Sequence, residues 1–192
     1  MHQIEPFYLW QHLYKAEEDE DSPFYGREYS EFIFTNKVYN FALHPQWDFI
    51  GSETLYIKLL YASNIDGLAI IECIGEWNDC ITNDIKILKE FLLDGLIDQG
   101  IENICLIGEN ILNFHGDNDC YYEELSNELE NGQVYFLNFL PHVINEMEYF
   151  GLLNHVNTVV LSEKENWRKK TPSQFYESIH SKVQNSNKKF YI

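Results

Sequence analysis

Residues 67–115 read GLAIIECIGEWNDCITNDIKILKEFLLDGLIDQGIENICLIGENILNFH, and this stretch decides the fold. It contains an apolar run (68–74), an acidic turn, an amphipathic segment that ends at Gly100, and a second apolar run (103–108). Short apolar runs on either side of a helix are typical of a parallel strand–helix–strand unit. We therefore predict that segments 68–74 and 103–108 lie side by side in one sheet, point the same way and end at a common edge.

The residues before this stretch complete a hairpin. Segment 55–61 alternates in the manner of a strand, and residues 63–67 have the composition of a turn. Lys58 then lies opposite Glu72, so we expect the two charges to pair across the strands. A buried catalytic carboxylate is the alternative interpretation of Glu72.

The residues after it continue the alternation of helices and strands. We expect helices near 119–129 and 141–150 and strands near 134–139 and 156–161. The predicted fold class is α/β, with a mixed sheet in the order ββαβαβα over residues 55–150 and helices packed on the sheet. An extra helix (5–16) and two short strands around a turn at 35–37 are expected at the N-terminus. We predict a single domain over 1–162 and a basic extension over 163–192.

Charge is unevenly distributed along the chain. Of the 13 Lys and Arg and 31 Asp and Glu residues, seven basic and three acidic ones lie in 163–192, which leaves 6 − 28 = −22 for residues 1–162. An acidic body repels phosphate backbones, so we do not expect nucleic acid as a partner. The basic extension is expected to fold back onto the acidic body.

The cysteines and the apolar runs bear on metals, cofactors and location. None of the four cysteines forms a C-x-x-C pair, so no metal site and no cofactor is expected. The sequence has no secretory signal pattern and no apolar run long enough to cross a membrane. We expect a cytoplasmic protein with reduced thiols.

Two stretches carry a resemblance to a known family. ENICLIGENILNFHGDND (102–119) and QVYFLNFLPHVINEMEYFGLLNHV (133–156) resemble the strand, loop and helix pattern of the STAS domain, the fold of anti-sigma-factor antagonists. The resemblance covers 55–150 and implies a non-catalytic regulatory module that binds a protein partner or forms a homo-oligomer. Phosphorylatable members have a Ser or Thr at the helix start, whereas residues 115–119 here read HGDND, so a phosphoryl switch is not expected.

Polar side chains follow both apolar runs, and ligands of open α/β sheets bind beyond the carboxyl ends of parallel strands. A second candidate region is the loop at 44–52. The candidate binding residues, none of them assigned a catalytic role, are Glu76, Trp77, Asp79, Glu109, His115, Asp117, Asp119, His44 and Trp47.

These residues allow two hypotheses. One is a protein-interaction module in which the acids cap helices and the Trp side chains fill the core. The alternative is a small metal-dependent hydrolase that uses the acids with His115. The absence of a specific catalytic motif favours the interaction module.

Overall fold

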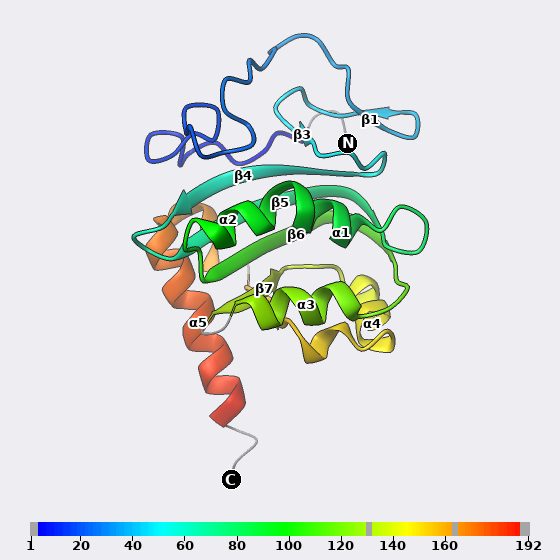
Figure 1. Ribbon diagram of the computed structural model, residues 1–192, viewed down its shortest axis with the longest axis vertical. Coiled ribbons are helices and arrows are strands. Elements are labelled where there is room, and N and C mark those ends of the chain that lie inside the picture. Colours follow the sequence, from blue (N-terminus) through cyan, green and yellow to red (C-terminus); the bar gives the residue numbers. More distant parts are fainter. Residues whose placement is uncertain (1–3, 130–131, 163–164, 189–192) are drawn as a thin grey trace.

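The structure, a computed structural model, describes residues 4–129, 132–162 and 165–188 (Figure 1). These residues form a sheet of six strands and a separate two-stranded ribbon, β1 (Lys37–Val38) with β2 (Phe41–Ala42). The strands of the large sheet, in their spatial order, are β3 (Asp48–Phe49), β4 (Leu55–Ser63), β5 (Leu68–Asn78), β6 (Asn103–His115), β7 (Gln133–Leu137) and β8 (Asn157–Val159).

Strand direction follows the predicted pattern. β3, β4 and β5 pair antiparallel, whereas β5, β6, β7 and β8 pair parallel. The prediction that 68–74 and 103–108 are parallel neighbours is therefore confirmed, with Leu68 opposite Asn103. The α/β class, the mixed sheet and the ββαβαβα order over 55–150 are confirmed as well.

The helices between the strands cover one face of the sheet, which we call the helical face. α1 (Asp84–Leu88), the π-helical turn η1 (Lys89–Leu93) and α2 (Asp94–Asp98) run on from one another and link β5 to β6. α3 (Cys120–Glu128), α4 (Pro141–Tyr149) and the short η2 (Leu152–Asn154) follow. Their apolar side chains pack on those of the sheet in one large core cluster. Sheet residues in this cluster include Ile57, Ile71, Leu106 and Phe136.

The other face is covered by the two ends of the chain, and we call it the cover face. The N-terminal end also adds Ala16, Phe24 and Ile50 to the core cluster of the helical face. Residues 4–50, here called the N-terminal cover, lie along β4 in Figure 1. η4 (Trp167–Lys169) and α5 (Pro172–Lys188) add Trp167, Phe175 and Ile179 to a second buried cluster with Ile70 and Leu137. A third cluster joins Trp47 of the cover to Tyr56 and Ile74 of the sheet. Both faces of the central strands are thereby removed from water.

Of the expectations for the N-terminus, the helix is wrong and the pair of short strands is right except for its position. Residues 9–13 form successive turns instead of a helix, and of the apolar side chains in these turns Trp10 is buried whereas Leu9 and Leu13 are exposed. The Trp10 indole donates a hydrogen bond to the Lys170 carbonyl (2.8 Å), which fixes this segment to the far end of the chain. The short strands do occur, but they lie at 37–38 and 41–42 instead of on either side of a turn at 35–37.

In the described part of the chain, no helix combines the length and the apolar character needed to span a membrane.

Candidate functional site

The predicted edge of the sheet lies further along the chain than the sequence indicated. β5 continues to Asn78 and β6 to His115, so segments 75–78 and 108–115 are strands instead of loops. The expected loop positions of Glu76, Trp77, Glu109 and His115 are corrected accordingly.

Bulges explain why these strand ends were missed. The register between β5 and β6 shifts between Glu72 and Ile74 and again between Gly75 and Glu76, so β6 carries extra residues there. Extra residues break the alternation of period two that marks a strand. In the sequence, Gly75 suggests the end of a strand. In the structure it lies within β5 at φ 114°, and glycine is needed there because a Cβ atom would come within 2.0 Å of the Thr54 carbonyl oxygen.

Asp79 is a buried structural carboxylate of the helical face. It accepts hydrogen bonds from the Trp77 indole (3.0 Å), the Tyr122 hydroxyl (2.6 Å) and the backbone N–H of Ile85 (2.9 Å) in the first turn of α1. Burial raises the pKa of Asp79 to about 6, although these hydrogen bonds oppose the shift. Three donors satisfy the hydrogen-bonding need of this buried carboxylate, so Trp77 and Asp79 serve the core and the start of α1.

Glu76 and His115 are the predicted residues that the structure brings together at the edge of the sheet. The Glu76 carboxylate accepts hydrogen bonds from the Tyr39 hydroxyl (2.8 Å) and the Asn113 amide (3.1 Å). His115 Nε2 lies 3.9 Å from Glu76 Oε2, and its side chain is half exposed. The hydrogen bond from Tyr39, which lies between β1 and β2, links the ribbon to the ends of β5 and β6.

Asp117 and Asp119 form separate contacts before α3. Asp117 accepts a hydrogen bond from the neighbouring Asn118 amide (2.7 Å). Asp119 accepts one from His155 Nε2 (3.0 Å), and this bond lowers the pKa of Asp119. Across the described ranges, no three His, Cys, Asp or Glu side chains gather closely enough to hold a metal ion.

Glu109 lies apart from these residues, on the cover face. Its carboxylate accepts hydrogen bonds from the Trp167 indole (2.8 Å) and the Asn138 amide (2.7 Å), and it pairs with Arg168 (2.8 Å). Burial would raise the pKa of Glu109, but these donors outweigh it and the pKa is lowered. Glu109 therefore anchors the C-terminal segment to the sheet.

Glu72 anchors both ends of the chain. It is 1% exposed, accepts a hydrogen bond from the backbone N–H of Phe7 (2.8 Å) and lies 3.6 Å from the Arg168 guanidinium. Burial raises its pKa to about 7. Lys58 lies opposite Glu72, which confirms the predicted register, but the ion partner of Lys58 is Asp48 (3.2 Å). The expected Lys58–Glu72 pairing is thus replaced by contacts with the covering segments.

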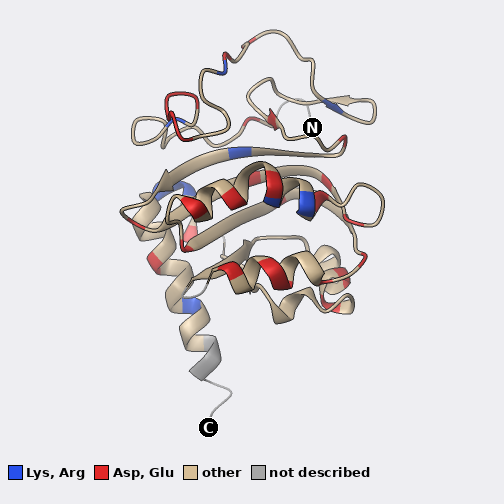
Figure 2. Cartoon of the chain, in the orientation of Figure 1, with Lys and Arg blue, Asp and Glu red and all other residues tan. Residues whose placement is uncertain are grey.

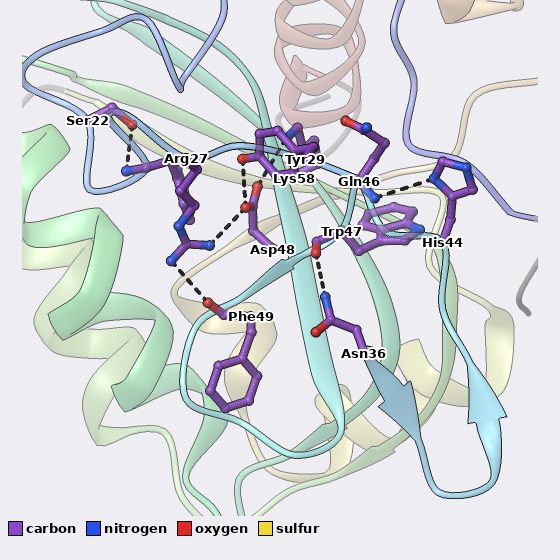
Figure 3. Close-up of polar contacts among 11 residues, drawn as sticks. Ser22, Arg27, Tyr29, Asn36, His44, Gln46, Trp47, Asp48, Phe49 and Lys58 are labelled. Atoms are coloured by element: carbon purple, nitrogen blue, oxygen red, sulfur yellow. Dashed lines mark hydrogen bonds and ion pairs between the residues drawn. The ribbon is translucent and has the colours of Figure 1, made fainter. Parts of the chain in front are cut away.

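Asp48 is the centre of a charged cluster that the sequence does not predict (Figure 3). It is 1% exposed and accepts hydrogen bonds from Arg27 (2.9 Å), the Tyr29 hydroxyl (2.7 Å) and Lys58 (3.2 Å). The Lys58 ammonium also lies 3.6 Å from the centre of the Tyr29 ring, as in a cation–π contact. A lysine in an otherwise apolar, buried strand is the sequence signal that could have indicated this cluster.

A pocket of about 670 Å³ opens beside this cluster. The N-terminal cover forms its walls, and Lys58 of β4 contributes to its lining. His44 lines the pocket and lies 3.4 Å from Glu5, whereas Trp47 is buried and donates its indole N–H to the Ile4 carbonyl (2.8 Å). The predicted residue His44 thus faces a cavity, and the predicted residue Trp47 is part of the core.

Exposed apolar side chains concentrate on the N-terminal cover. Phe32 is 84% exposed and Ile33 is 65% exposed, and Phe34 follows them. Eleven of the sixteen large apolar side chains exposed in the described residues belong to 4–50; they are Ile4, Tyr8, Leu9, Leu13, Tyr25, Phe32, Ile33, Phe34, Tyr39, Phe41 and Phe49. The helices on the helical face carry few such side chains by comparison.

Comparison with family models and with curated proteins gives no match to this sequence. Solved structures similar to the chain include two of one protein, SpoIIAA. The anti-sigma factor antagonist SpoIIAA in its unphosphorylated form matches with 18% identity and a TM-score of 0.45, over 57% of this chain and 90% of SpoIIAA. The Bacillus cell fate determinant SpoIIAA in the phosphorylated form matches with 18% identity and a TM-score of 0.41, over 57% of this chain and 94% of SpoIIAA. Both matches are to an anti-sigma-factor antagonist, the type of protein named in the sequence resemblance, and each spans slightly more than half of this chain.

Proposed function

We propose that this chain is a non-catalytic protein-interaction module that binds its partner through the N-terminal cover. The observation that carries the proposal is the concentration of exposed apolar side chains there, above all Phe32 and Ile33. Apolar side chains gathered on a surface are typical of protein-interaction sites. At the edge of the sheet, hydrogen bonds within the fold hold Glu76, Trp77, Asp79 and Asp119, which leaves the cover as the better candidate.

The charge of the cover defines the chemistry of the partner. The run Glu17–Asp21 contains five acids, and residues 1–162 have a net charge of −22. Figure 2 shows acidic residues on the cover and on the helices alike. Opposite charges favour encounter and suppress wrong partners. We therefore expect a partner protein whose surface combines apolar side chains with Lys and Arg.

We further propose that the basic extension forms a unit with the domain of residues 1–162. Ile179 and Val183 of α5 are buried against the cover face, and Lys182 pairs with Glu165 (2.6 Å). The four cysteines are free thiols, which agrees with action in the cytoplasm.

The experiment compares two double variants of the full chain. Phe32→Ser with Ile33→Ser removes exposed apolar side chains from the cover. The matched control, Ile65→Ser with Tyr149→Ser, removes side chains that are 93% and 82% exposed elsewhere. Binding of a partner recovered by the wild-type chain is then measured for each variant.

We expect the cover variant to lose partner binding and the control to retain it. Equal binding by both variants would overturn the proposed surface. If the wild-type chain recovers only further copies of itself, sedimentation of both variants decides whether the cover forms a homo-oligomer.

A further inference from the structure

Two buried lysines of this protein differ in how well their charge is balanced. Lys89 in η1 contacts three carboxylates, those of Asp94 (2.8 Å), Glu124 (2.9 Å) and Glu128 (3.0 Å), and its pKa is raised. The side chain of Lys58 is 8% exposed, close to the 5% of Lys89, but within the described residues its ion pair is with Asp48 alone. Burial lowers the pKa of Lys58 despite that contact. Its ammonium thus has one close carboxylate, whereas that of Lys89 has three.

The imbalance of charge is local and lies where Lys58 lines the pocket. Arg27 and Lys58 both pair with Asp48, so two cations share one carboxylate, an excess of one positive charge. The other charged side chains that line the pocket are Lys15 and three acids, Glu5, Glu17 and Glu31, and all four are exposed or half-buried. Charges near water are screened more strongly than buried ones. This part of the pocket consequently attracts a negative group although the protein as a whole carries −18.

The walls of the pocket indicate the rest of the ligand. Phe7, Tyr29 and Phe32 line it together with the polar side chains of Gln11 and Gln46. Its volume of about 670 Å³ lies in the range of small-molecule sites. Aromatic walls favour a flat apolar group, and a single excess charge favours a monoanion.

We propose that this pocket binds a small aromatic monocarboxylate, with the carboxylate at Lys58 and Arg27 and the ring between the aromatic walls. Phe32 belongs both to this pocket and to the partner surface proposed above, so the two sites adjoin. The carboxylate of the ligand adds a second negative charge at Lys58, as Glu124 and Glu128 add negative charge at Lys89.

The test titrates the full chain with benzoate and with benzamide, its neutral counterpart, at low ionic strength, and follows amide chemical shifts by NMR. Lys58→Met removes the proposed contact. Lys86→Met makes the same change of charge at a lysine on α1 that pairs with Glu90. Gln11→Trp narrows the pocket from an exposed position and leaves the charged cluster intact, so it tests the site even if Lys58→Met fails to fold.

We expect saturable binding of benzoate, with shifts at the pocket and a dissociation constant raised by about tenfold to hundredfold in Lys58→Met. Gln11→Trp is expected to weaken binding and Lys86→Met to leave it unchanged. Benzamide binding as tight as that of benzoate, or benzoate binding unaffected by Lys58→Met and Gln11→Trp, would overturn the proposal. Tighter binding of inorganic phosphate than of benzoate would also overturn the assignment of a monocarboxylate.

Discussion

The two faces of one sheet are buried in different ways. The helical face presents apolar side chains such as Ile57, Ile71 and Leu106, and the helices supply more of the same. The cover face carries Lys58 and Glu72 in the middle of β4 and β5, between two apolar clusters. An apolar side chain accepts many partners, whereas a buried charge needs a particular one.

That difference explains why the ends of the chain are part of the structure. The partners of the buried charges are Asp48, the Phe7 N–H and Arg168, and all three come from the covering segments. Removal of either segment would leave charges on the sheet without partners. The helical face thus supplies stability, and the charged contacts of the cover face determine where the covering segments lie.

The largest expected effect is on the helical face. Phe136 is 1% exposed and stacks on Phe139, with ring centres 5.0 Å apart. We expect Phe136→Ala to lower the free energy of unfolding by about 3–5 kcal/mol, because it removes buried area and leaves a cavity. Urea denaturation measures the change. A loss below about 1 kcal/mol, the centre of the distribution for point variants, would contradict the assigned core.

On the cover face we expect a similar loss of stability, one that a second substitution can restore. Asp48→Asn leaves Lys58 and Arg27 without their carboxylate and should cost about 3 kcal/mol, as for other broken buried pairs. The double variant Asp48→Asn with Lys58→Met removes the unpaired buried ammonium and should recover much of that loss. A double-mutant cycle in urea tests the coupling. Strictly additive effects would show that the Asp48–Lys58 contact contributes nothing to stability.

A smaller effect depends on pH and arises from Glu72. Its pKa is about 7 in the folded protein against an ordinary value of 4.5, so the folded state binds more protons between these values. The free energy of unfolding should therefore fall as pH rises through this window. The Glu72→Gln variant has no carboxylate to titrate at this position. Its stability relative to the wild type should therefore rise between pH 5 and 8 by on the order of 2 kcal/mol. Parallel stability curves for the two proteins would contradict the burial of this carboxylate.

The smallest effect on stability is expected for the proposed interaction surface. Phe32→Ser with Ile33→Ser changes side chains that are already exposed, so the free energy of unfolding should stay within about 0.5 kcal/mol. A loss near that of Phe136→Ala would mean that these side chains support the fold. Because this double variant keeps the stability of the wild type, a loss of partner binding can be assigned to the surface itself.

The sequence predicted the elements whose pattern is local. The apolar runs at 68–74 and 103–108 and the helix between them occur as expected, since strand and helix periods are visible within a few residues. The continuation of both strands was missed, because the bulges near Gly75 and Glu109 disturb the alternation. The helix expected at 5–16 was wrong, because Trp10 is held by the distant Lys170 carbonyl.

The charged contacts were the least accessible to sequence reasoning. Lys58 and Glu72 were placed opposite each other correctly, yet their partners lie 10 and 96 residues away, at Asp48 and Arg168. Such pairings depend on how the covering segments cross the sheet, which no local pattern encodes. The same holds for the pocket beside Asp48, whose walls come from the N-terminal cover.

Hydrogen–deuterium exchange of the full chain, alone and with the partner that it recovers, tests the account most directly. We predict that partner binding slows exchange in the N-terminal cover, centred on 32–41, and leaves the helical face at α1 and α3 unchanged. Protection confined to α1 and α3, with none in the cover, would contradict the assignment of the two faces.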